Sequence, residues 1–125
     1  MAMKKFSLLL FLFLNQAHAL ELNCKLSHWS FSNGTTEIKS WSAPVINDSV
    51  YYYADLNEYY VENGEEYRVS SRYSLANGFF YAELYNRKTD NGSYSESYQA
   101  VEKPNIATRY QNLELRCYFN KSQER

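Results

Sequence analysis

Residues that could perform catalysis are sparse in this sequence. His18 belongs to a predicted leader segment, so His28 is the only histidine of the remaining chain, and no serine lies in a nucleophile-elbow context. Two cysteines with one histidine cannot supply the four ligands of a structural zinc site. The sequence also lacks a phosphate-binding glycine loop and a calcium-binding loop. We therefore expect a protein that is not an enzyme and that carries no cofactor or metal.

Recognition chemistry is better represented, because the chain contains 13 tyrosines. A tyrosine offers ring area for stacking and a hydroxyl group at low entropic cost, which makes it common at recognition surfaces. Tyrosine is also a good strand former, and cross-strand aromatic pairs stabilise half-exposed sheets, so a scaffolding role is the alternative interpretation. Counting outward from the predicted turns places one set of residues on a single sheet face, which we call the tyrosine face: Tyr51, Tyr53, Tyr59, Tyr81, Tyr85, Tyr94 and Tyr98 among Asp55, Arg68, Arg72, Glu83, Arg87 and Glu96.

The elements that must position these side chains are indicated by the glycines. All four glycines of the chain follow an asparagine, at Asn33-Gly34, Asn63-Gly64, Asn77-Gly78 and Asn91-Gly92. An asparagine-glycine pair tolerates the positive φ values of a type I′ turn, whose twist matches that of two antiparallel strands. Each pair therefore predicts a β-hairpin.

The segments between these turns and the two prolines read as strands, because β-branched and aromatic residues crowd them and no helical period is present. The stretch from 45 to 62 is long for one strand and contains turn residues that could divide it, which would give an eighth strand. We expect an all-β antiparallel meander of seven or eight strands. The predicted strands cover residues 21–32, 35–43, 50–62, 65–76, 79–90, 93–103 and 106–119.

Two of the predicted turns fix a charge register on the tyrosine face. If Asn63-Gly64 and Asn77-Gly78 are two-residue turns, Arg72 lies opposite Asp55 on one neighbouring strand and opposite Glu83 on the other. Opposite charges that face each other across a strand pair stabilise it. The register therefore predicts a ladder of ion pairs.

A two-residue turn at Asn91-Gly92 extends this register. It places Tyr85 opposite Tyr98 and Arg87 opposite Glu96. Rings that stack beside groups able to orient polar atoms are suited to ligand binding. The predicted binding residues are Tyr53, Tyr81, Tyr85, Tyr94, Tyr98, Arg72 and Arg87.

The opposite side of the same strands is predicted to form the core. In the first hairpin, alternation from Cys24 turns Trp29, Phe31 and Ile38 outward, and a bulge near Ser27 would reverse this. This hairpin therefore carries either a second aromatic patch or an irregular strand, and the sequence leaves both open. The predicted inner residues of the central hairpins are Tyr52, Ala54, Leu56, Tyr60, Tyr67, Val69, Tyr73, Leu75, Phe80, Ala82, Leu84 and Val101.

The two cysteines, Cys24 and Cys117, lie near opposite ends of the predicted domain and are expected to form a disulfide. Residues 20–24 and 113–117 share the pattern Leu-Glu-Leu-x-Cys, in which the leucines and the cysteine alternate with polar residues. A disulfide between these segments brings the first and last strands together. It removes the open edges of the sheet by closing a small barrel, which we favour, or by packing a sandwich.

The N-terminal residues predict the cellular location. A basic start, an apolar run from Phe6 to Leu14 and the small-residue ending Ala17-His18-Ala19 form a secretory signal peptide. We therefore expect a leader at 1–19, a single β domain at 20–125, and export to a bacterial periplasm or the extracellular space. The apolar run is shorter than the roughly 20 residues that span a membrane, so no membrane insertion is expected after cleavage.

The overall charge narrows the class of partner. Thirteen basic and 14 acidic residues give a formal net charge of −1. This balance provides no electrostatic basis for binding nucleic acid. Oligomeric state does not follow from the sequence.

These features favour a non-catalytic binding module that recognises a glycan or a small ligand through the tyrosine face, and the expected partner is a protein or a glycan. The alternatives are a secreted inhibitor of an enzyme and a structural component of the cell envelope. A cleaved leader followed by a small β domain whose cysteines link its ends resembles the layout of bacterial periplasmic inhibitors of C-type lysozyme. Those inhibitors carry a Ser-Gly-x-x-Tyr stretch and a Trp-x-x-Gly element that are absent here, and the nearest segment, Ser71-Arg72-Tyr73, lacks the glycine. No residue roles are therefore transferred from that family.

Overall fold

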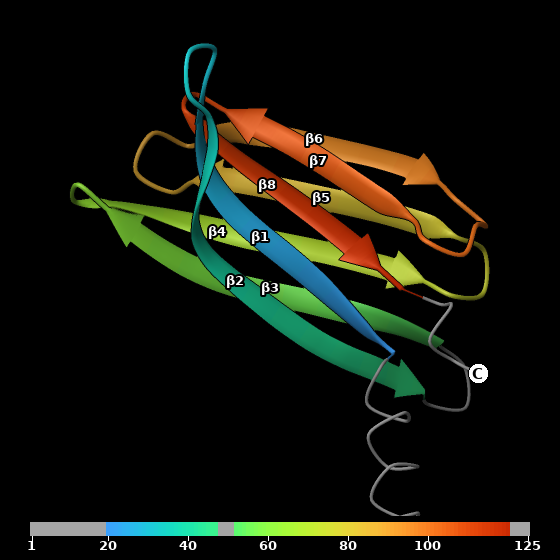
Figure 1. Ribbon diagram of the computed structural model, residues 1–125. Helices are drawn as coiled ribbons and strands as arrows, with labels where there is room; N and C mark the ends of the chain where they lie inside the picture. The colour runs from blue at the N-terminus through green and yellow to red at the C-terminus, as the bar shows by residue number, and fades with distance from the viewer. Residues whose placement is uncertain (1–19, 48–51, 121–125) are drawn as a thin grey trace, which may run out of the picture.

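The computed structural model describes residues 20–47 and 52–120 (Figure 1). The predicted leader and Tyr51 lie outside these ranges. Within them every regular element is an antiparallel strand, which confirms the all-β prediction. The strands are β1 (Glu21–Ser30), β2 (Gly34–Asn47), β3 (Tyr52–Glu62), β4 (Glu65–Ser74), β5 (Phe79–Asn86), β6 (Asn91–Tyr98), β7 (Asn105–Tyr110) and β8 (Leu113–Phe119).

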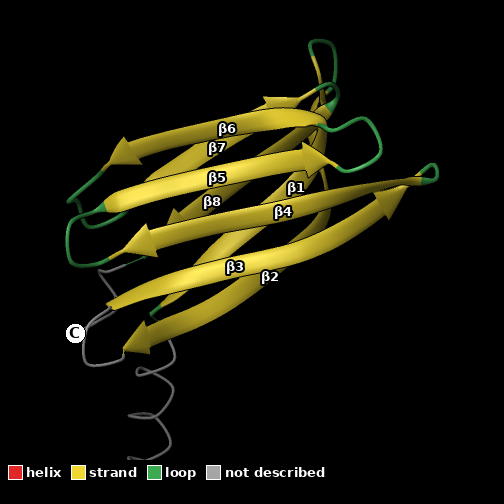
Figure 2. Ribbon diagram, turned by 180° about the vertical axis from the view of Figure 1, so that it is seen from behind, coloured by secondary structure: helices red, strands yellow, loops and turns green. Residues whose placement is uncertain are grey.

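The strands form one curved sheet with the order β6-β5-β4-β3-β2-β1-β8-β7, which wraps into a nearly closed barrel. Strands β3 to β6 make one wall, and β2, β1, β8 and β7 make the other (Figure 2). The eighth strand does not come from the 45–62 stretch, where the sequence suggested it. It arises because the predicted 106–119 strand turns back at Gln111, whose φ is 55°, and so divides into β7 and β8.

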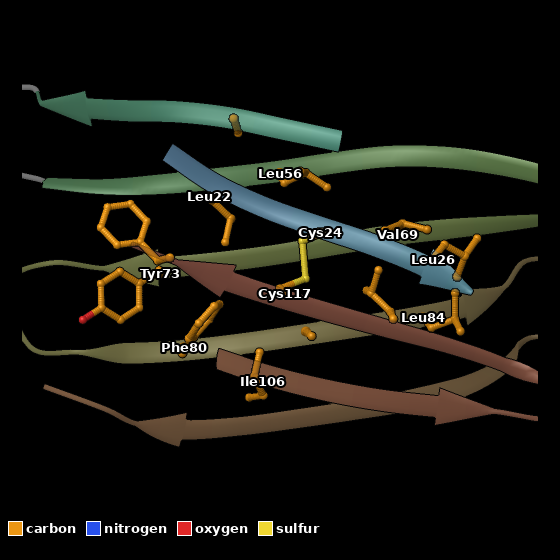
Figure 3. Close-up of a cluster of buried hydrophobic side chains, with 14 of the residues drawn as sticks. Leu22, Cys24, Leu26, Leu56, Val69, Tyr73, Phe80, Leu84, Ile106 and Cys117 are labelled. Atoms are coloured by element: carbon orange, nitrogen blue, oxygen red, sulfur yellow. A yellow bond between two sulfur atoms is a disulfide. The ribbon is translucent and has the colours of Figure 1, made fainter. Parts of the chain in front are cut away.

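The predicted disulfide is present and joins the first strand to the last. Cys24 and Cys117 are directly opposite each other in the β1–β8 pair, with their Cα atoms 4.1 Å apart. Both cysteines are fully buried, and the bond lies among apolar side chains that converge from the two walls (Figure 3). The first and last strands therefore lie side by side in the sheet, as expected.

The interior is filled by apolar side chains. The ring of Tyr73 stacks on Phe119 at a centroid distance of 4.9 Å and meets Phe80 edge-on at 5.1 Å, and its hydroxyl donates to the backbone oxygen of Gln99. The prediction for Val101 is wrong, because β6 ends at residue 98 and Val101 is exposed. The predicted inner residues that are buried are Ala54, Leu56, Tyr67, Val69, Tyr73, Phe80, Ala82 and Leu84, with Tyr60 and Leu75 partly buried against them.

The last seam of the barrel, between β6 and β7, is bridged by side chains. The hydroxyl of Thr108 donates to that of Ser93 at 2.8 Å. The amide of Gln99 donates to the backbone oxygen of Asn105 and accepts its backbone N–H, at 2.7 and 3.1 Å. This amide reproduces the exchange of hydrogen bonds found in an antiparallel strand pair.

The β2–β3 seam is paired only at its end. Three residue pairs join the strands, from Val45 opposite Ala54 to Asn47 opposite Tyr52. The remainder of β2 carries a bulge opposite Leu26 and Ser27, as well as Pro44. Of the two alternatives left open for the first hairpin, the irregular strand is present, because the register shifts between Leu26 and Ser27 and Ile38 is partly buried against the core. Phe31 nevertheless stays outward and is exposed. A bulge and a proline disfavour pairing with a further strand along this open edge.

The turns explain the register of the central strands. Asn63 and Gly64, with φ of 52° and 75°, form the predicted two-residue turn, so Asp55 lies opposite Arg72. The β4–β5 and β5–β6 connections are four-residue loops, 75–78 and 87–90, instead of two-residue turns. Each register shift this causes is an even number of residues, so the side chains within β4, β5 and β6 keep their predicted faces while their cross-strand partners change.

Gly92 lies within β6 for a reason other than a turn. A Cβ atom at this position would meet the backbone of Leu84 and lie 2.8 Å from the Cα of Tyr85 on β5. The β5–β6 turn is instead set by Asn86, whose side-chain oxygen accepts the backbone N–H groups of residues 88 and 89. The glycine of the fourth asparagine-glycine pair is therefore required for close strand approach.

Candidate functional site

The outer surface of β5 and β6 carries an exposed aromatic cluster of Phe79, Tyr81, Tyr94 and Tyr98. Alternation along β5 turns Phe79 and Tyr81 outward, and pairing with β6 places Tyr98 directly opposite Phe79. The rings of Tyr81 and Tyr94 stack at 5.6 Å, and those of Phe79 and Tyr98 lie at 5.1 Å. Tyr94 is 49% and Tyr98 is 73% exposed. The cluster therefore presents accessible ring surface to a ligand.

Arg72 connects this cluster to a charged region on β3 and β4. Its Nε donates to Oδ1 of Asp55 at 3.2 Å, and its guanidinium lies 4.6 Å from the ring centre of Tyr53. The hydrogen bond to Asp55 raises the pKa of Arg72, although burial acts in the opposite direction. Tyr81 is the cross-strand partner of Arg72, and burial followed by the charge of Asp55 raises the pKa of its hydroxyl. The predicted pair of Arg72 with Asp55 is thus confirmed.

The predicted pair of Arg72 with Glu83 is wrong. Because the β4–β5 loop has four residues, Glu83 moves two positions along β4 and lies opposite Ser70. Its carboxylate instead accepts a 2.8 Å hydrogen bond from Arg68, whose guanidinium also lies 5.0 Å from the ring centre of Tyr85. The ladder therefore continues with a different cation on the same face.

The predicted pair of Arg87 with Glu96 is also wrong, for the same reason in the next loop. Arg87 follows the end of β5, where it donates to Glu66 at 3.2 Å and lies 5.5 Å from the ring centre of Tyr59. Glu96 accepts the hydroxyl of Tyr94 at 2.9 Å. Burial, reinforced by this carboxylate, raises the pKa of Tyr94 to about 12, so the phenol remains protonated at neutral pH.

Tyr85 and Tyr98 are not opposite each other, contrary to the prediction. Tyr85 faces Gly92, and its hydroxyl bonds to Asp90 in the β5–β6 turn. Tyr98 faces Phe79 at the other end of the β5–β6 pair. The sequence prediction did not include Phe79 among the binding residues, although its position two residues before Tyr81 places it on the tyrosine face.

Three open pockets of about 300, 230 and 250 Å³ follow one another across the tyrosine face. Arg72 and Tyr81 line both the first and the second, and Glu83 lines both the second and the third. Phe79 borders the first pocket and Tyr94 the third. Three rings of the aromatic cluster and the ion pairs of Arg68 and Arg72 therefore border one continuous recessed surface.

The structure brings most of the predicted binding residues to this surface. Tyr53, Tyr81 and Arg72 line the first pocket, and Tyr85 and Tyr94 line the third. Tyr98 lies next to this surface, because its ring contacts that of Phe79 in the first pocket. Arg87 lies apart, beside Glu66 and the turn between β3 and β4.

Comparison with models of protein families, with curated proteins and with solved structures finds no match for this chain. Across residues 20–47 and 52–120, no helix has the length and apolar character needed to cross a membrane.

Proposed function

We propose that this protein is an exported, non-catalytic binding module that recognises a glycan through the tyrosine face. The observation that carries the proposal is the exposed aromatic cluster beside a ladder of half-exposed ion pairs. Sugar rings present apolar faces that pack on aromatic rings, while their hydroxyl groups need well-placed polar partners. The exposed rings of Tyr94 and Tyr98 supply the packing surface. Asp55, Arg72 and Glu83 supply the polar partners.

The experiment is a binding screen of purified protein against a panel of oligosaccharides, followed by affinity measurements for the best ligand. Tyr94→Ala and Tyr98→Ala should each weaken binding by about 1 kcal/mol or more, because both remove stacking area that is exposed in the free protein. Tyr118→Ala is the matched control, since Tyr118 is an exposed tyrosine on β8 in the other wall. Equal losses for all three variants, or unchanged affinity for Tyr94→Ala and Tyr98→Ala, would contradict the assignment.

The export part of the proposal rests on the predicted leader and is supported by the disulfide. Disulfides form and persist in oxidising compartments, and the Cys24–Cys117 bond joins the two ends of the domain. Expression of the full chain should yield a processed protein whose N-terminal residue is Leu20, as determined by N-terminal sequencing. An unprocessed protein that stays in the cytoplasm would contradict export without affecting the glycan proposal.

A second candidate function, inhibition of an enzyme, is favoured by the tip of the β1–β2 hairpin. Phe31 at this tip is 98% exposed and stands edge-on against Trp29 at 5.2 Å. The guanidinium of Arg109 lies 4.3 Å from the ring centre of Trp29, and the indole N–H of Trp29 donates to the backbone oxygen of Gln111. A preorganised aromatic tip of this kind fits a concave site on another protein.

The layout shared with C-type lysozyme inhibitors supplies the test of this second candidate. Purified protein should reduce lysozyme activity, and Phe31→Ala should abolish the effect while Tyr98→Ala leaves it intact. Absence of inhibition by the unmodified protein would remove a C-type lysozyme as the target.

A further inference from the structure

The charges of the tyrosine face restrict the kind of glycan that it can bind. Each of its three arginines already has a carboxylate partner: Arg68 with Glu83 at 2.8 Å, Arg72 with Asp55 at 3.2 Å, and Arg87 with Glu66 at 3.2 Å. An anionic ligand would have to compete with these carboxylates for the guanidinium groups. The paired arginines therefore do not form a site for sulfate, phosphate or uronate groups.

Two further carboxylates on this surface have phenol hydroxyls as partners. Glu96 accepts the hydroxyl of Tyr94, and Asp90 bonds to that of Tyr85. Asp90, Tyr85 and Tyr94 all line the third pocket, together with Glu83. Lys88 is the other cation nearby, and it lies in the β5–β6 loop beyond the end of the strand. The carboxylates named here thus each have an arginine or a phenol hydroxyl as partner, so they do not offer an unpaired anion to a cationic ligand.

The exposure of the carboxylates determines what they can do for a ligand. Glu83, the central one, has a side chain that is 29% exposed, so it bonds to Arg68 while remaining reachable from the second and third pockets. A carboxylate has about four lone-pair sites and can accept several hydrogen bonds at once. Hydroxyl groups of a sugar can donate to the remaining sites without displacing the arginine.

We infer that the glycan recognised by the tyrosine face is uncharged, an inference that rests on the proposed function. Its ring faces pack on the exposed rings of Tyr94 and Tyr98, and its hydroxyl groups donate to the carboxylates of Asp55 and Glu83. The paired arginines hold those carboxylates in place. Binding should consequently depend little on ionic strength, because no net charge is neutralised when a neutral sugar binds.

The test compares three sets of tetrasaccharide probes of similar size. Neutral probes are maltotetraose, cellotetraose and tetra-N-acetylchitotetraose, the anionic probe is tetragalacturonate, and the cationic probe is chitosan tetramer. Affinities are measured by titration calorimetry at about 20 mM salt, where charges are weakly screened, and at about 200 mM salt, where they are strongly screened. We expect at least one neutral probe to bind, with less than about a twofold change in affinity between the two salt concentrations.

A variant reverses the predicted selectivity. Glu83→Gln keeps the volume of the side chain and leaves Arg68 without its carboxylate partner, so it should weaken neutral binding at least about fivefold and permit binding of tetragalacturonate. Glu114→Gln is the matched control, because Glu114 pairs with arginines in the other wall and should change neither affinity.

The outcomes separate the inference from the proposed function. Binding of tetragalacturonate or of the chitosan tetramer alone by the unmodified protein would overturn the inference and leave glycan recognition standing. Binding of none of the probes at millimolar concentration would overturn both. Neutral binding that survives Glu83→Gln unchanged would show that this carboxylate does not contact the sugar, which overturns the inferred contact set.

Discussion

The two walls of the barrel contain similar interactions that differ in how much they remain accessible. In the wall of β1, β2, β8 and β7, the side chain of Glu114 is 7% exposed, accepts Arg109 at 2.8 Å and lies 3.8 Å from Arg116. On the tyrosine face, Glu83 pairs with Arg68 and remains partly exposed. A buried carboxylate that serves two cations has little capacity for another partner, whereas a half-exposed one retains it.

The aromatic residues show the same contrast. Trp29 is fixed between Arg109 and Phe31, and its indole N–H is used by the backbone of Gln111. These contacts tie the β1–β2 hairpin to the β7–β8 turn. Tyr94 and Tyr98 contact rings on β5 and are 49% and 73% exposed. The comparison indicates that the first wall mainly holds the barrel together and the second presents a surface.

The largest expected effect on stability comes from removing the disulfide, which lies in the first wall. Replacing Cys24 and Cys117 by serine together should lower the free energy of unfolding by about 4 to 5 kcal/mol, because the bond closes a segment with a sequence separation of 93 residues. Urea unfolding of the variant and the parent protein measures the difference. A loss below about 1 kcal/mol would mean that closure of the barrel does not depend on this bond.

The second test compares one carboxylate from each wall. Glu114→Ala leaves two arginines without a buried partner and should cost about 1.5 to 3 kcal/mol. Glu66→Ala removes the partner of Arg87 from a half-exposed pair and should cost less than about 1 kcal/mol. Thermal and urea unfolding of both variants gives the comparison. Equal costs would remove the distinction between the two walls.

The sequence predicted the faces of the strands better than their pairing. Side-chain direction depends only on the period of two, so the alternation that puts Phe80, Ala82 and Leu84 inside is visible without knowing the partners. Pairing depends on loop length, and an asparagine-glycine pair permits a two-residue turn without requiring it. Gly92 shows why this signal misled, since its glycine is needed for close approach to Tyr85 within the sheet.

For the candidate site, too, the sequence predicted which residues share a face but not which residues pair across the strands. Residues that depend on face alone, such as Tyr53, Tyr81 and Tyr94, share the outward face that was predicted for them, and they line the recessed surface there. The predicted partners of Tyr85 and Arg87 were counted from a two-residue turn at Asn91-Gly92. The turn lies elsewhere, so both predicted partners are wrong. The sequence signal for the four-residue loop was Asn86, an asparagine whose side chain can accept the backbone N–H groups that follow it.

The smallest expected effect concerns the one ion pair whose register was predicted correctly. Asp55 and Arg72 are direct cross-strand partners, but both side chains are about a third or more exposed, so water screens their attraction. Reversing either charge alone, as Asp55→Arg or Arg72→Asp, should cost less than about 1 kcal/mol. Each single variant also places like charges opposite each other.

The double exchange, Asp55→Arg with Arg72→Asp, restores opposite charges at the same two positions. It should recover most of the lost stability, apart from the contribution of the Arg72 guanidinium over the ring of Tyr53, which the exchange does not rebuild. A double-mutant cycle measured by urea unfolding should give a coupling of about 0.2 to 1 kcal/mol that shrinks at high salt. A coupling as large as the cost of Glu114→Ala would show that the tyrosine face holds the barrel together as strongly as the other wall, and the contrast between a supporting wall and a presenting wall would then fail.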